Sequence, residues 1–223
     1  VGIVGLLGAG VPLLTLASIG GSREMFGGSY VVDQFALVLK GLFLVAGALV
    51  LLASVSYLRH GRYYEGEYYF LVLASIAGAV VMASARDLIT VFIGLELVSG
   101  PAFLLAGWRK GDLRSNEAAL KFFLIGVLSS AILLFGMSLV YGTTGEYTFA
   151  GIRQATTAGL GAEPAFILGV LLVLVGFGFK IAAVPFHFWA PDTYEGSPLP
   201  VAAYLSVGSK GAGFVGLLTT CYL

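Results

Sequence analysis

The stretch PAFILGVLLVLVGFGFKIAAVPFHFWAP, residues 164–191, decides the fold. Its first part is apolar and uncharged up to Lys180, and the prolines Pro185 and Pro191 follow that lysine. A helix of about 20 residues crosses the roughly 30 Å hydrocarbon layer of a membrane. Pro185 lacks the N–H that would bond to the carbonyl of Ile181, and Pro191 repeats the interruption. We therefore expect a membrane helix that is broken between about residues 181 and 190, with Lys180 just before the break.

Six further apolar stretches accompany this one. Their continuous apolarity differs from the alternating pattern of a membrane β-barrel, and helices are the other structure that satisfies its backbone groups in lipid. We predict an all-α, polytopic transmembrane helical bundle that forms a single transmembrane domain over residues 1–223. Its expected spans, about seven, are 1–19, 36–58, 68–84, 88–107, 118–141, 165–184 (broken near 181–190) and 200–223.

The composition excludes several classes of protein. Of the 223 residues, 58% are apolar and 11% are charged, against roughly a quarter charged in a soluble domain. Twelve basic and twelve acidic residues leave no basic surface for nucleic acid. One cysteine and two histidines build neither a disulfide framework nor a zinc site. No dinucleotide fingerprint or phosphate loop is recognisable. We expect lipid as the solvent, and no metal or cofactor in this chain.

Three ionisable residues lie deep in the apolar stretches: Glu96, Lys180 and Lys210. A charge at the centre of a membrane helix costs about 2.5–3.5 kcal/mol on the insertion scale, so such residues are functional candidates by default. The alternative is a structural ion pair. The helix around Lys210 is only marginally hydrophobic, and we therefore expect Lys210 to face protein or internal water. Pro101 follows Glu96 at the spacing at which Pro185 follows Lys180.

Other polar residues give less specific predictions. We expect Lys40, near a helix end, to reach the membrane interface, as lysines there commonly do. Lys121 has Glu117 one turn earlier as a possible partner. His187 falls in the irregular part of the broken helix. Ser99 and Thr90 could hold water near Glu96, or simply pack between helices.

Several motifs together make the sequence recognisable. They are Gly94-Leu95-Glu96-Leu97, Phe179-Lys180, the run from Pro185 to Pro198 (PFHFWAPDTYEGSP) and Ser206-Val207-Gly208-Ser209-Lys210. With them the chain resembles the N-type antiporter-like membrane subunits of NADH:quinone oxidoreductase, the respiratory complex I. The L-type and M-type subunits and the Mrp cation/proton antiporters share the broken helix, but the Tyr-Glu-Gly-Ser-Pro run resembles the N type.

The resemblance implies an antiporter-like fold, of which this chain would be the first half of an inverted repeat. Val1 is not an initiator Met, and we expect residues to be missing from both ends. The resemblance also implies that Glu96, Lys180, Lys210, His187 and Lys121 carry proton translocation. Redox chemistry would take place elsewhere, with flavin, iron-sulfur clusters and quinone in other subunits. The expected partners are M-type and K-type membrane subunits, and the expected location is a bacterial plasma membrane.

A mechanism follows as a hypothesis from these charges. Burial disfavours the charged form of a lysine, and a carboxylate nearby favours it. Glu96 moving toward Lys180 would therefore load the lysine with a proton, and Glu96 moving away would release that proton, with Lys210 as the next acceptor. Two alternatives remain open at this point: a subunit of an Mrp-type cation/proton antiporter, and a purely structural membrane scaffold.

Overall fold

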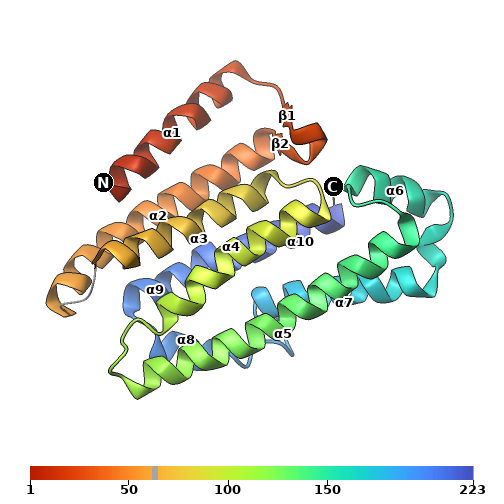
Figure 1. Ribbon diagram of the computed structural model, residues 1–223. Helices are drawn as coiled ribbons and strands as arrows, with labels where there is room; N and C mark the ends of the chain where they lie inside the picture. The colour runs from red at the N-terminus through yellow and green to blue at the C-terminus, as the bar shows by residue number, and fades with distance from the viewer. Residues whose placement is uncertain (62–64, 223) are drawn as a thin grey trace.

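The computed structural model describes residues 1–61 and 65–222 and consists of long helices that run side by side (Figure 1). The long helices are α1 (Gly2–Ile19), α2 (Gln34–Gly61), α3 (Glu65–Ser84), α4 (Leu88–Ala106), α5 (Leu113–Thr144), α7 (Pro164–Lys180) and α10 (Lys210–Tyr222). Shorter elements join them: the hairpin β1 (Arg23–Met25) and β2 (Tyr30–Val32) with η1 (Phe26–Gly28), then α6 (Phe149–Thr157), η2 (Leu160–Ala162), α8 (Ala190–Gly196), α9 (Leu199–Tyr204) and the π-helical turn η3 (Leu205–Ser209).

The predicted fold class is confirmed. Six helices in the described part of the chain are long and apolar enough to cross a membrane, when α9, η3 and α10 are taken as one continuous helix over Leu199–Cys221. The seventh apolar helix, α7, is shorter because it ends at Lys180. Each expected range contains a helix, and the last expected residue, 223, lies outside the described residues.

Helix ends differ from the apolar ranges where polar residues extend a helix. α5 begins at Leu113 rather than near 118, because the side chain of Asp112 accepts a hydrogen bond from the N–H of Arg114 at 3.0 Å and caps the helix. The hairpin β1–β2 was not expected from the sequence. Directly after it, Asp33 at the start of α2 forms an ion pair of 2.6 Å with Arg86 in the turn before α4.

Glycines bring two pairs of helices into backbone contact. A Cβ atom on Gly78 of α3 would lie 2.6 Å from the backbone N of Val98 in α4. A Cβ atom on Gly136 of α5 would lie 2.7 Å from the carbonyl oxygen of Gly169 in α7. Small residues at such crossings let membrane helices approach closely. α3 with α4, and α5 with α7, therefore form two tightly joined pairs.

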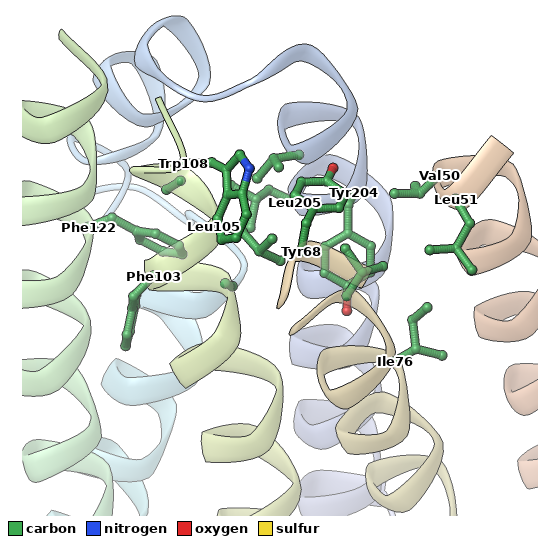
Figure 2. Packing of buried hydrophobic residues seen from close by; sticks show 14 of the residues in the cluster. Val50, Leu51, Tyr68, Ile76, Phe103, Leu105, Trp108, Phe122, Tyr204 and Leu205 are labelled. Carbon is green, nitrogen blue, oxygen red and sulfur yellow. The ribbon is translucent and has the colours of Figure 1, made fainter. Parts of the chain in front are cut away.

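Aromatic side chains fill the interior where α4 ends. Figure 2 shows Trp108, Tyr68, Phe103 and Phe122 in this buried cluster. The rings of Tyr68 and Trp108 meet edge to face at 5.4 Å, and those of Phe103 and Phe122 at 4.8 Å. Phe122 also stacks on Trp189, which follows the break in α7, at 4.7 Å. The cluster thereby fixes the position of the chain on both sides of the break.

Candidate functional site

Lys180 is the last residue of α7, and the helix ends as the prolines predict. The N–H of Ala182 bonds to the carbonyl of Phe179 at 2.9 Å and that of Ala183 to Gly178 at 2.8 Å, which is the Schellman pattern of a helix end. Ala182 takes the left-handed conformation, with φ of 56°, that this motif requires. The indole N–H of Trp189 donates to the carbonyl of Phe179 at 3.1 Å. A side chain thus replaces part of the bonding that the break removes.

The Lys180 ammonium is enclosed by protein. Lys180 is 3% exposed, and its Nζ donates a hydrogen bond to Oγ of Ser99 at 2.7 Å. Its aliphatic stem lies against α10, since a Cβ atom on Gly213 would meet Cγ of the lysine at 2.9 Å. The ring of Phe122 is 5.9 Å from Nζ. Because the carboxyl end of a helix carries a partial negative charge, the end of α7 also stabilises a cation there.

Glu96 lies on α4 one turn before Ser99, so both side chains are on the same face of the helix. Its carboxylate oxygen Oε1 accepts a hydrogen bond from Oγ of Ser130 in α5 at 2.5 Å. The residue is half-buried, and its carboxylate interacts electrostatically with the Lys180 ammonium. Among the contacts of the described residues, each charge bonds to a different serine, Glu96 to Ser130 and Lys180 to Ser99, and no direct ion pair joins the two charges.

A small cavity lies beside Lys180 and the two serines that bond to Lys180 and Glu96. Its volume is about 10 Å³, and its lining includes Ser99, Ser129, Ser130 and Lys180 together with apolar side chains from α4, α5 and α7. The structure therefore brings Glu96 and Lys180, two of the predicted site residues, into one polar cluster inside the bundle, together with Ser99 and Ser130. Ser99 was recognised in the sequence as a neighbour of Glu96. Ser130 was not, although a pair of serines inside the apolar range 118–141 was a visible signal.

Lys210 is half-buried and lies at the first residue of α10. Its Nζ is 5.1 Å from the centre of the Tyr194 ring, a cation–π contact that places it against protein on that side. The π-helical turn Leu205–Ser209 comes directly before it, and such turns are frequent at functional sites. Gly213, which touches the stem of Lys180, follows Lys210 by three residues on the same face of α10. α10 therefore carries Lys210 and, one turn later, the contact with the stem of Lys180.

Buried polar atoms without a hydrogen-bond partner gather near Tyr194. In the described part of the chain they are Tyr194 Oη, Thr193 Oγ1, Ser197 Oγ, Trp108 Nε1 and Arg109 Nε. The two segments that carry them are joined by a bond of 2.9 Å from Arg109 to the carbonyl of Gly196. Buried polar groups of this kind are usual binding sites for ordered water. A polar region therefore extends from Lys210 along α8.

Lys121 and His187 lie apart from this interior network. Lys121 is 42% exposed and forms ion pairs with Glu117 at 2.6 Å, as its spacing suggested, and with Asp192 of α8 at 2.5 Å. A pocket of about 200 Å³ lies beside this network, lined in part by Glu117 and Asp192. His187 is in the irregular segment, as predicted, but its side chain is exposed. The sequence identified Lys121 without its second partner, because Asp192 is distant along the chain.

One lesser expectation is wrong. Lys40 is 4% exposed rather than interfacial: its Nζ donates to Oη of Tyr30 at 2.9 Å, because the unexpected hairpin covers that end of α2. Thr90, whose role was left open between holding water near Glu96 and packing between helices, bonds to the start of its own helix. Its hydroxyl and its N–H both bond to the carboxylate of Asp87, which caps α4.

Comparison with known proteins places the chain in a family. The transmembrane family described as NADH:quinone oxidoreductase/Mrp antiporter matches residues 85–223. NADH-quinone oxidoreductase subunit N of Trichlorobacter lovleyi is 43% identical over 97% of this chain, and subunit N 2 of Streptomyces griseus is 49% identical over 85%. The chain spans 44% and 36% of the lengths of these two relatives.

Solved structures agree with this placement. A chain of respiratory complex I from Thermus thermophilus superposes with a TM-score of 0.80 at 36% identity, over 98% of this chain and 46% of that one. A chain of the Mrp complex from Dietzia shares the fold, with a TM-score of 0.77 at 24% identity over 98% of this chain and 42% of that one. The protein is therefore an integral membrane protein that belongs to the NADH:quinone oxidoreductase/Mrp antiporter transmembrane family.

Proposed function

We propose that this chain forms the proton-translocating part of an N-type subunit of NADH:quinone oxidoreductase. The observation that carries the proposal is the buried placement of Lys180 beside the hydroxyl that lies one turn from Glu96. A lysine in this position costs free energy to bury, which a purely structural scaffold has no reason to retain. The relatives compared above are named as subunits of that oxidoreductase.

In this proposal the chain moves protons and performs no redox step. Lys180 holds a proton while the Glu96 carboxylate is close, because opposite charges favour each other's ionised forms. Lys210, at the start of α10, receives the proton when that influence weakens. The hydroxyl and indole groups around Tyr194 supply sites for water between Lys210 and the acidic pocket at Glu117 and Asp192. Lys121 holds those two carboxylates in place.

The proposal also assigns partners. Neighbouring membrane subunits of the M and K types would contact this one in a bacterial plasma membrane, and other subunits would hold flavin, iron-sulfur clusters and quinone. Within the family these partners set the energy source, since electron transfer to quinone must drive the change at Glu96. Relatedness to membrane complexes in general supports the presence of such partners.

The test replaces Glu96 by Gln in the intact complex, reconstituted in sealed vesicles. The change keeps the shape of the side chain and its ability to accept a bond from Ser130, but removes the negative charge. We expect NADH-driven proton uptake per electron to fall, while the matched control Glu163→Gln, at an exposed residue before α7, pumps normally. Normal pumping by Glu96→Gln would refute the proposal.

Experiments with the same vesicles distinguish the proposed function from that of a cation/proton antiporter. In a cation/proton antiporter, proton movement depends on which alkali cation is present. We expect pumping to be unchanged when K⁺ replaces Na⁺ on both sides. Loss of proton movement in K⁺ would assign the chain to an Mrp-type antiporter instead.

A further inference from the structure

The cavity between Lys180 and Ser130 has the properties of a binding site for one water molecule. Its volume of about 10 Å³ is close to the smallest that admits a single water, and a buried water needs two to four polar partners. Four of its ten lining residues carry a hydroxyl or an ammonium group, namely Ser99, Ser129, Ser130 and Lys180, and the rest of the lining is apolar. An entirely apolar cavity of this size would stay dry, whereas these four side chains are enough to supply the two to four partners of one water.

The directions of the three hydroxyl protons differ. Ser99 donates its proton to the carbonyl of Leu95 at 2.5 Å. Ser129 donates to the carbonyl of Gly176 at 3.1 Å. Ser130 alone among the three donates to a titratable group, the Glu96 carboxylate at 2.5 Å. A backbone carbonyl does not take up a proton at ordinary pH, whereas a carboxylate does.

We propose that Ser130 and one water in this cavity form a proton relay from Lys180 to Glu96. The Lys180 ammonium gives a proton to the water, the water gives one of its protons to Oγ of Ser130, and Ser130 gives its own proton to Oε1 of Glu96. One proton moves in total: the lysine becomes a neutral amine and Glu96 becomes a carboxylic acid. The water and the serine end with the protons they need, so no further reactant is consumed.

The other two serines have positioning roles in this arrangement. Ser99 accepts one of the three N–H groups of Lys180 at 2.7 Å, which fixes Nζ at the wall of the cavity and leaves two N–H groups for other acceptors. Ser129 ties α5 to α7 beside the cavity. The relay rests on the proposed function, and it adds a path by which Glu96 exchanges a proton with Lys180 as well as acting on it as a charge.

Ser130→Ala removes the relay hydroxyl and leaves Glu96 and Lys180 intact. We expect proton-coupled NADH:quinone turnover in sealed vesicles to slow about tenfold, the change that one hydrogen bond to a charged group produces. Ser130→Thr keeps a hydroxyl and should restore the rate. The matched control Ser138→Ala removes an exposed serine of the same helix, bonded to its own backbone, and should be neutral. A solvent deuterium isotope effect that is present in the wild type and in Ser130→Thr should change in Ser130→Ala.

Each outcome of these experiments either supports or overturns the relay. Wild-type turnover in Ser130→Ala overturns the relay, and so does a Ser130→Thr variant as slow as Ser130→Ala, because then size rather than the hydroxyl matters. Alanine is smaller and a better helix former than serine, so failure to assemble would show a structural role and also overturn it. If Glu96→Gln lowers pumping and Ser130→Ala does not, the relay fails and the proposed function stands. If Glu96→Gln has no effect, the proposed function itself fails.

Discussion

Replacing Lys180 by Met should remove proton pumping without weakening the protein. Burying an ammonium costs several kcal/mol. The structure offers it one hydrogen bond to Ser99 at 2.7 Å, worth about 1.5–3 kcal/mol for a charged donor, and the end of α7, worth roughly 0.3–1 kcal/mol. A methionine at this position has neither the cost of burying a charge nor the stabilisation from the hydrogen bond and the helix end. Its sulfur gains a contact of about 0.3–1.5 kcal/mol with the ring of Phe122.

The expected change in the free energy of unfolding therefore lies between zero and about 2 kcal/mol in favour of the variant. Thermal unfolding of the detergent-solubilised complex measures it, at roughly 2–4 °C per kcal/mol for a chain of this size. Lys180→Ala is the matched comparison and should lose about 2–5 kcal/mol, since it leaves a cavity. The reasoning is wrong if Lys180→Met is destabilised by about 3 kcal/mol or more, because that is the cost of breaking a well-formed buried ion pair.

Two further predictions concern the same part of the bundle. Lys210→Met should leave the thermal midpoint nearly unchanged, since a cation–π contact contributes only about 0.5–1 kcal/mol, while pumping per electron falls; normal pumping would remove Lys210 from the pathway. Gly136→Ala should cost roughly 1–3 kcal/mol, because the new Cβ would lie 2.7 Å from the carbonyl of Gly169. Gly142→Ala in the same helix, where nothing lies within 4 Å, should be neutral or stabilising in the same melting assay.

The architecture could be predicted because it depends on local rules. Apolar length places membrane helices, and a proline that cannot donate a bond ends α7 near Lys180. Helix ends were less predictable, since a cap such as Asp112 extends α5 into a charged segment that hydropathy does not count. The hairpin before α2 contains no apolar signal of helix length, and so the burial of Lys40 under Tyr30 was missed.

The charged residues of the site could be predicted from the sequence, but the hydrogen bonds that connect them to other helices could not. Glu96 and Lys180 are conspicuous because each is a charge in an apolar segment. The serine that joins Glu96 to α5 is 34 residues away along the chain, and only helix packing selects Ser130 for that contact. The exposure of His187 depends in the same way on how the irregular segment folds back after Lys180, which spacing along the sequence does not determine.

The glycine contacts divide the bundle mechanically. α3 and α4 meet backbone to backbone at Gly78, and α5 and α7 do so at Gly136, so we expect each pair to move as one rigid body. Between the pairs, α4 meets α5 through a side chain, the ring of Phe103 against Gly126, and an interface of this kind slides more readily than a backbone contact. The bonds from Ser130 to Glu96 and from Lys180 to Ser99 both cross that interface. A shear between the two pairs would therefore change both contacts in a single movement, which, under the proposed function, would give a distant driving subunit one mechanical coordinate through which to act on both charges.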